Sequence, residues 1–348
     1  MFAQRKDRTM KKDIDWQNLT FSYMDTGKYV MSVFQNGAWG AIELKTDPHI
    51  NIHIAATPLH YGQAIFEGLK AFTQKNGDIV IFRPDANGQR MIRSADRVVM
   101  QAPPVELFVD ACKRVVKENL DYVPPFGTGA SLYLRPFIFG LTPRVGVQPA
   151  DDYAFMVFAT PVGPYYKGGM KPIRAYVQEK YDRAAPKGVG NAKVAGNYAA
   201  GLLGDKDAKK QGFSTCLYLD SAEHKFIDEF SASNFFAITK DKKTYVTSSS
   251  AAALPSITND ALQTIARDLG MNVEKRPVAF SELGSFSEVG ACGTAAVITP
   301  VGEIVRGEQT LKFGDMDKPG ETLTKLYNQL TGIQSGVVAD THGWTVKV

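Results

Sequence analysis

One lysine stands alone in a stretch of small residues. Residues 188–201 read GVGNAKVAGNYAAG, in which Lys193 is the only charged side chain and Tyr198 the only aromatic one. A lysine amine attacks carbonyl groups, and it also serves as a base where burial lowers its pKa. Glycine and alanine let the backbone pass close to a flat ligand. The stretch therefore suits either a solvated lysine in a turn or a lysine that reaches a planar ligand.

A carboxylate between aromatic residues is the second candidate. Glu229 lies in FIDEFSASNFF, residues 226–236. Because acidic side chains are seldom fully buried unless they are paired, Glu229 is expected to have a cationic partner. The alternative is a turn at a strand end with exposed carboxylates.

Two further segments can present backbone N–H groups to an anion. In LPSITNDALQ, residues 254–263, Pro255 and Ser256 precede a helix, so the N–H groups of Ile257 and Thr258 are free of helical partners. GACGTAAV, residues 290–297, places Thr294 in a run of small residues. Taken alone, the first is an ordinary capped helix and the second a tight turn.

Together these parts meet one chemical need. A lysine that forms a Schiff base, a carboxylate that keeps a ring nitrogen protonated, and a helix N-terminus with an arginine for a phosphate are what pyridoxal 5'-phosphate requires. The sequence thus favours an enzyme that uses this cofactor.

The composition argues against several other classes of protein. The chain has 348 residues, 44% of them hydrophobic, and a net charge of +4 without charge blocks, so neither nucleic acid nor membrane is indicated as a partner. The N-terminal segment lacks the apolar core of a signal peptide. Three cysteines and five scattered histidines have no metal-ligand spacing, so we expect no metal and a cytoplasmic location.

The elements that must hold these residues are mixed, which predicts an α/β or α+β fold. Strands are expected at 29–35, 50–56, 77–82, 131–140, 153–160, 173–179, 216–220, 235–239 and 244–248. Helices are expected at 90–100, 105–120, 197–209, 257–270 and about 323–333. Residues 164–172 are rich in Gly and Pro and predict a linker between a smaller domain, 1–163, and a larger cofactor-binding domain, 173–348.

Long motifs in a fixed order resemble one family. They are LHYGQAIFEGLKAF (59–72), FRPDANGQRMIRSADR (82–97), SLYLRPFIFG (131–140), PVGPYY (161–166) and GNAKVAGNY (190–198), followed by the Glu229, Ile257 and Thr294 segments. The sequence resembles the branched-chain amino-acid aminotransferases of the fold-type IV pyridoxal-phosphate enzymes, from about residue 29 to the C-terminus. The resemblance implies two domains with the cofactor between them.

The resemblance also implies roles at the cofactor. Lys193 would be the Schiff-base lysine and the general acid and base, Glu229 would face the ring nitrogen, and Tyr198 would bond the ring hydroxyl oxygen. The phosphate would be held by Arg90, the N–H groups of Ile257 and Thr258, and the hydroxyl of Thr294.

The implied substrates are L-leucine, L-isoleucine or L-valine with 2-oxoglutarate, in a ping-pong cycle. An aromatic pocket would be formed by Phe66, Tyr133 and Tyr165, with Arg135 nearby for the second carboxylate. Tyr61 and the N–H groups of Thr294 and Ala295 would receive the α-carboxylate. Val145 and Val147 match a loop that reaches into the partner's site, so a homodimer or larger homo-oligomer is implied.

Some residues depart from the family pattern, and other interpretations of the function stay open. Ala296 and Thr299 replace a redox CxxC, and Ser231 and Ala232 replace residues beside the substrate, which affects side-chain preference. Other fold-type IV enzymes, such as a D-amino-acid transaminase, an R-selective amine transaminase or an aminodeoxychorismate lyase, share the lysine and the glutamate. A non-catalytic protein that binds the cofactor has no need to keep both.

Overall fold

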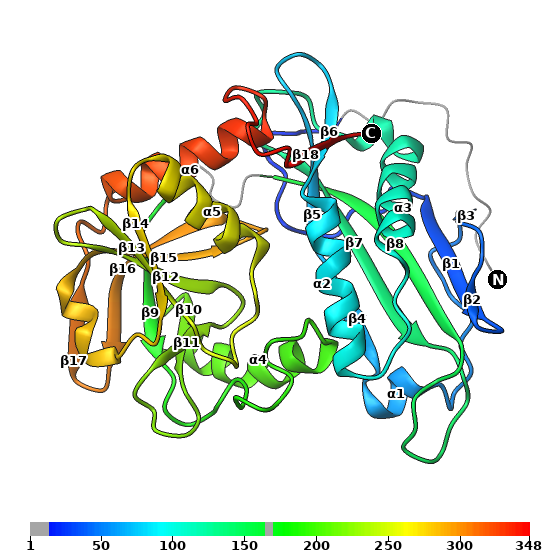
Figure 1. The fold of residues 1–348 in the computed structure, drawn as a ribbon, viewed down its shortest axis with the longest axis horizontal. Helices are drawn as coiled ribbons and strands as arrows, with labels where there is room; N and C mark the ends of the chain where they lie inside the picture. Colours follow the sequence, from blue (N-terminus) through cyan, green and yellow to red (C-terminus); the bar gives the residue numbers. More distant parts are fainter. Residues whose placement is uncertain (1–13, 164–169) are drawn as a thin grey trace.

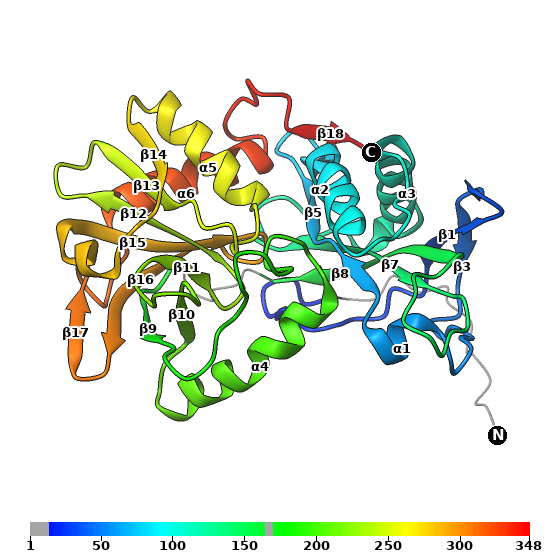
Figure 2. The ribbon, with the colours of Figure 1, turned by 60° about the horizontal axis from the view of Figure 1, so that its bottom comes forward.

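The fold consists of two sheets that lie side by side, each covered by its own helices (Figures 1 and 2). The computed structural model describes residues 14–163 and 170–348. Each sheet has nine strands. Mixed helices and strands in both halves confirm the predicted α/β (α+β) class.

The first sheet is built from the N-terminal half and is antiparallel throughout. Its order is β18-β6-β5-β7-β8-β1-β2, with β3 paired to β1 and β4 to β7. The strands are β1 (Tyr29–Gln35), β2 (Ala38–Trp39), β3 (Glu43–Lys45), β4 (Ala64–Phe66), β5 (Leu69–Thr73), β6 (Ile79–Phe82), β7 (Ser131–Gly140), β8 (Tyr153–Val162) and β18 (Thr345–Lys347). The C-terminal strand β18 pairs with β6, so the end of the chain returns to this sheet.

The second sheet is mixed. Its order is β11-β10-β9-β16-β15-β12-β13-β14, with β17 on β16, and the pairs β9–β10, β9–β16 and β13–β14 are parallel. The strands are β9 (Ile173–Val177), β10 (Thr215–Leu219), β11 (Ile227–Phe230), β12 (Asn234–Thr239), β13 (Thr244–Ser248), β14 (Asn272–Arg276), β15 (Phe286–Gly293), β16 (Val297–Arg306) and β17 (Gln309–Lys312).

Helices cover the sheets and lie between them. They are α1 (Thr57–Tyr61), α2 (Pro84–Arg97), α3 (Val105–Glu118), α4 (Ala195–Lys210), α5 (Ile257–Asp268) and α6 (Glu321–Gln334), with short 3₁₀ turns at Leu120–Tyr122 and Phe280–Ser285. In α3 the buried residues Phe108, Cys112, Val115 and Val116 recur at helical spacing and pack on the first sheet's core. The helix predicted at 105–120 is thus confirmed nearly to its ends.

Two predicted elements differ from the structure. Residues 50–56 do not form a strand, because the N–H of Ala56 closes a turn onto the carbonyl of His53 and the chain then enters α1, which has a proline in its first turn. The helix predicted at 90–100 begins earlier, at Pro84, and ends at Arg97 because Val99 adopts a left-handed conformation with φ of 53°.

The remaining helices and most strands follow the prediction within a few residues. Gly270, the last residue of the range 257–270 predicted as a helix, follows the end of α5 and has φ of 77°, the left-handed conformation that glycine adopts without strain. The N-terminal segment (1–13) and most of the predicted linker lie outside the described residues. The domain boundaries 1–163 and 173–348 stay a prediction.

Candidate active site

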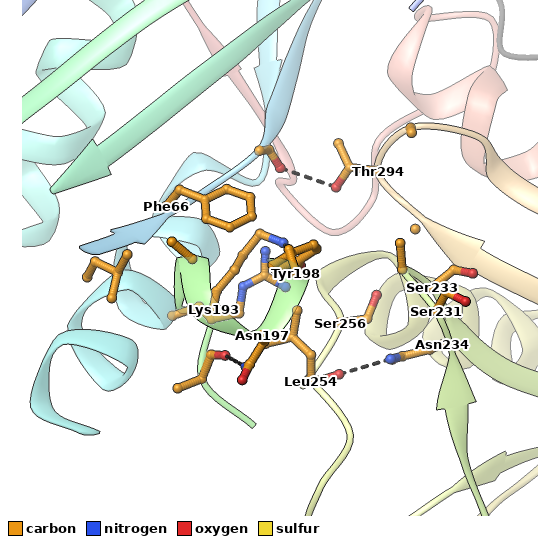
Figure 3. A pocket seen from close by; sticks show the side chains of 18 of the residues that line it. Phe66, Lys193, Asn197, Tyr198, Ser231, Ser233, Asn234, Leu254, Ser256 and Thr294 are labelled. Atoms are coloured by element: carbon orange, nitrogen blue, oxygen red, sulfur yellow. Dashed lines mark hydrogen bonds between the residues drawn. The ribbon is translucent and has the colours of Figure 1, made fainter. Parts of the chain in front are cut away.

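A cavity of about 720 Å³ lies where the two sheets meet. Both halves of the chain line it: β4 and β7 from the first sheet, the loop before α4, and the ends of β11 and β15 from the second. Figure 3 shows Lys193, Tyr198 and Phe66 on one side, and Ser231, Asn234 and Ser256 on the other. The volume is in the range of small-molecule sites.

The backbone of Lys193 is fixed by the first sheet and α2. Its N–H donates to the hydroxyl of Ser94 at 2.9 Å, and its carbonyl accepts from the N–H of Phe66 at 3.1 Å. A Cβ on the nearby Gly190 would collide with the carbonyl of Ala252. Gly190 is therefore required where the backbone before Lys193 passes the backbone of Ala252.

The ammonium group of Lys193 lies within the cavity. Nζ is 2.6 Å from the hydroxyl of Tyr198 and 4.5 Å from the ring centroid of Phe66. Burial, followed by the positive charge of Arg90, lowers the pKa of Lys193 to about 7. A lysine with that pKa exchanges a proton near neutral pH, which a solvated lysine does not.

Glu229 has the cationic partner that its position predicted. Oε1 lies 3.0 Å from Nη1 of Arg183, while Oε2 accepts from the Asn234 side chain at 2.6 Å and from the N–H of Leu254 at 3.2 Å. Burial raises the pKa of Glu229 to about 7, against the opposing effect of Arg183. Glu229 is thus a buried carboxylate on β11, not an exposed one at a turn.

Arg90 projects from α2 into the same cavity and is held by a second buried carboxylate. Its Nε and Nη2 donate to Glu67 at 2.8 and 2.6 Å, and its Nη1 donates to the carbonyl of Pro255 at 3.1 Å. Glu67 is fully buried. This fork geometry fixes the plane of the guanidinium and leaves one N–H on each terminal nitrogen for an anion.

The start of α5 is capped as its sequence predicts. The hydroxyl of Ser256 accepts from the N–H of Asn259 at 3.1 Å. Within the described part of the structure, no hydrogen bond uses the N–H groups of Ile257 and Thr258. These two residues line a small cavity of about 20 Å³, which Thr294 also lines, next to the larger one.

The turn between β15 and β16 is held by the first sheet. Thr294 donates its hydroxyl to the carbonyl of Gly68 at 3.2 Å, and Lys70 donates from Nζ to the carbonyl of Ala295 at 2.7 Å. Burial lowers the pKa of Lys70 to about 8. The turn that carries Thr294 and Ala295 is thus fixed at the cavity wall by residues from the other sheet.

One wall of the cavity is aromatic and carries a cation. Tyr133, Arg135 and Phe137 alternate along β7, so all three side chains face the cavity. Arg135 donates to the hydroxyl of Tyr133 at 3.2 Å, and its guanidinium lies 4.9 Å from the Phe66 ring centroid. The predicted residues Phe66, Tyr133 and Arg135 therefore lie together.

Three predicted residues lie elsewhere. Tyr61 does not line the cavity; its side chain is exposed and its hydroxyl donates to the carbonyl of Val145. The side chains of Val145 and Val147 are exposed. Tyr165 lies outside the described residues.

Sequence reasoning missed Arg183, Glu67 and Lys70. Glu67, between β4 and β5, and Lys70, in β5, stand in the motif LHYGQAIFEGLKAF, and an acid and a lysine in an otherwise apolar stretch are the available signal. Arg183, in KYDRAAPKG, has no local signal, because its partner Glu229 lies far along the chain.

Comparison with known proteins agrees with this geometry. The profile of the family Amino-transferase class IV matches residues 64–304. The chain belongs to this family. It is 48% identical to the branched-chain-amino-acid aminotransferase of Haemophilus influenzae over 97% of this chain and 99% of the relative. It is 42% identical to the enzyme of the same name from Helicobacter pylori, over 97% and 98%.

Solved structures agree with the fold. The branched-chain aminotransferase of Escherichia coli superposes with a TM-score of 0.74 at 28% identity, covering 91% of this chain and 98% of the other. The branched-chain aminotransferase of T.th., solved with pyridoxamine 5'-phosphate, gives 0.76 at 26% identity, covering 93% and 99%. The resemblance to fold-type IV aminotransferases is confirmed.

Proposed function

We propose that this aminotransferase moves the amino group between L-leucine, L-isoleucine or L-valine and 2-oxoglutarate, with pyridoxal 5'-phosphate as its cofactor. The observation that carries the proposal is the pair of buried groups in one cavity, Lys193 and Glu229, each with a pKa of about 7. The names of the relatives agree with it.

The residues of the cavity fit this cofactor. Arg90, the free N–H groups of Ile257 and Thr258, and the hydroxyl of Thr294 gather at one end, where a phosphate would bind. Glu229 faces the cavity as a carboxylate with Arg183 behind it, which suits a protonated ring nitrogen. When bound, the cofactor supplies an electron sink for the bond broken at the substrate Cα.

The side chains of this chain then divide the work. Lys193 moves the proton from the substrate Cα, because its pKa of about 7 leaves much of the amine unprotonated at neutral pH. The hydroxyl of Tyr198, 2.6 Å from Nζ, orients that amine. Glu229 keeps its negative charge at slightly alkaline pH because Arg183 and the two N–H donors stabilise it.

The two substrates differ in their side chains, and one pocket has groups for both. The rings of Phe66 and Tyr133 suit a branched aliphatic chain, and Arg135 suits the second carboxylate of 2-oxoglutarate. The N–H groups of Thr294 and Ala295 are candidates for the shared α-carboxylate, because the turn is fixed by Gly68 and Lys70.

A second copy of the chain completes this proposal. Val145 and Val147 are 89% and 83% exposed, and Tyr61 lies beside Val145. Exposed apolar side chains that lie together, unlike single ones, mark contact surfaces. We propose that Tyr61, Val145 and Val147 reach the cavity of a partner subunit in a homodimer. Tyr165 as a substrate residue and the cytoplasmic location stay predictions; in the described part of the chain no helix has the length and apolarity needed to cross a membrane.

A panel of amino donors with 2-oxoglutarate tests the proposal. We expect L-leucine, L-isoleucine and L-valine to react, and D-alanine and simple primary amines to be poor donors. Lys193→Ala should lose at least a thousandfold in rate, whereas the distant control Lys240→Ala should keep it. Reaction of D-alanine without L-leucine would support a D-amino-acid transaminase, and full activity of Lys193→Ala would exclude the mechanism.

A further inference from the structure

A second cavity of about 540 Å³ lies behind the turn that carries Thr294 and Ala295. It is lined by β5, the segment 124–131, which ends at the first residue of β7, and the C-terminal half of α6, which reaches the first sheet at this point (Figure 1). The N–H of Lys75 donates to the carbonyl of Ser335 at 2.9 Å and fixes α6 there. Ala295 lines both this cavity and the active site, so one turn separates them.

The lining of this cavity indicates what it would hold. Its described walls contain Phe72, Phe126 and Tyr327 and several small residues, which suit an apolar body. Lys70 is the only charged residue among the described lining residues, and no acidic one accompanies it. A small organic anion with an apolar body therefore matches the cavity, whereas a cation or a large polyanion does not.

Two polar groups at the cavity have hydrogen-bonding capacity that the described part of the chain does not use. Gln334 is 7% exposed, and no hydrogen bond within the described chain uses its side-chain amide. The Lys70 ammonium has three N–H donors, and Ala295 is its one hydrogen-bond partner in that part of the chain. The Gln334 amide and the spare N–H groups of Lys70 can therefore donate to a carboxylate bound in this cavity.

We propose that this second cavity is a regulatory site for a small monocarboxylate with an apolar body, which binds Lys70 and Gln334 and weakens substrate binding at the active site. The regulation rests on the proposed function, because Lys70 holds the turn whose N–H groups would receive the substrate carboxylate. A carboxylate bound in the second cavity attracts the Lys70 ammonium and draws Nζ away from the carbonyl of Ala295. When that hydrogen bond lengthens, the turn is held less firmly, because it is one of the two hydrogen bonds described above that tie the turn to the first half of the chain.

The test uses 3-phenylpropionate as the probe on the holoenzyme. We expect the KM for L-leucine to rise with probe concentration and then level off, because coupling between two sites is finite. Simple competition in the active site raises the KM without limit. A linear rise, or no effect of the probe, would overturn the proposal.

Matched variants locate the binding. Thr331 lines the second cavity and Thr324 does not, yet each donates its hydroxyl to the carbonyl four residues earlier on α6 at 2.8 Å. We expect Thr331→Phe to fill the cavity and abolish the saturating rise of the KM for L-leucine, and Thr324→Phe to preserve that rise. Equal responses of the two variants would contradict the location.

Calorimetry separates this proposal from the proposed function. Titration with 3-phenylpropionate should show a binding event in the wild-type protein that Thr331→Phe lacks and that Gln334→Leu weakens about tenfold. Gln334→Leu keeps the size of the side chain and serves if Thr331→Phe does not fold. The wild-type protein could fail to react with L-leucine while the binding event is still lost in Thr331→Phe. That result would support the cavity assignment and reject the proposed function. Unchanged binding in both variants would reject the cavity assignment.

Discussion

Replacing Arg183 with methionine removes the cation beside Glu229 while keeping an apolar stem of similar length. Both side chains are 6% exposed, and Nη1 lies 3.0 Å from Oε1. Leaving a buried carboxylate unpaired costs about 3–5 kcal/mol if it stays charged. Glu229 has a pKa of about 7, so it avoids much of this cost at neutral pH by taking up a proton.

The stability loss should therefore depend on pH. The pKa of Glu229 is raised on folding, so its contribution to stability is largest below the unfolded value of about 4.3 and falls as pH rises through the folded value. In the wild type the contribution of Glu229 to stability stops falling just above pH 7. In Arg183→Met the pKa of Glu229 in the folded protein is higher still, so the free energy of unfolding continues to fall above pH 7. The difference in the free energy of unfolding between the two proteins therefore grows by about 1.4 kcal/mol per pH unit.

Urea unfolding of the cofactor-free protein at pH 6, 7, 8 and 9 measures this gap. The change at pH 6 includes the lost packing and the lost hydrogen bond from Arg183 to the carbonyl of Ala252, which do not titrate. Arg174→Met is the control, because Arg174 lies 3.0 Å from Glu303 in a pair whose arginine is 43% exposed. We expect that control to lose less than about 1 kcal/mol, without a trend in pH. A pH-independent loss in Arg183→Met would refute the reasoning.

Two further variants probe the residues that hold the site. Lys70→Met removes the hydrogen bond to Ala295, so the KM values for L-leucine and 2-oxoglutarate should rise about tenfold or more. The absorbance of the bound cofactor should not change. Steady-state kinetics of Lys70→Met and of Lys70→Arg, which keeps the positive charge and should restore the KM values, checks this. Glu67→Gln removes a negative charge that raises the pKa of Lys193, so the acidic limb of the kcat/KM profile against pH should move to lower pH; a profile that stays in place would show that Glu67 does not act on Lys193.

The sequence predicted the helices and strands better than the long-range contacts between them. The amphipathic α3 and α5 and the buried strands β7 and β8 follow directly from their apolar spacing. Residues 50–56 alternate like a strand, yet a local turn and Pro58 determine their conformation. Alternation is a weak signal where a turn and a proline follow within a few residues.

The same limit applies to the site. Lys193 and Glu229 were found because their local context is unusual, and the resemblance assigned Arg90 among the four arginines of its motif. Arg183 pairs with Glu229 only because the loop before α4 passes β11, and Lys70 reaches Ala295 only because β5 approaches the turn after β15. Such long-range contacts depend on how the two sheets meet, which no short stretch of sequence specifies.

Lys193 and Glu229 are proposed to serve a bound pyridoxal 5'-phosphate in the transfer of an amino group from a branched-chain L-amino acid. The most direct measurement is the visible absorbance spectrum of the purified holoenzyme before and after addition of L-leucine without a keto acid. We expect an absorbance band in the visible range that bleaches to a near-ultraviolet band, and no such change in Lys193→Ala. A band that D-alanine alone bleaches would contradict the proposed substrates, and no band after pyridoxal 5'-phosphate is added would contradict the role of Lys193.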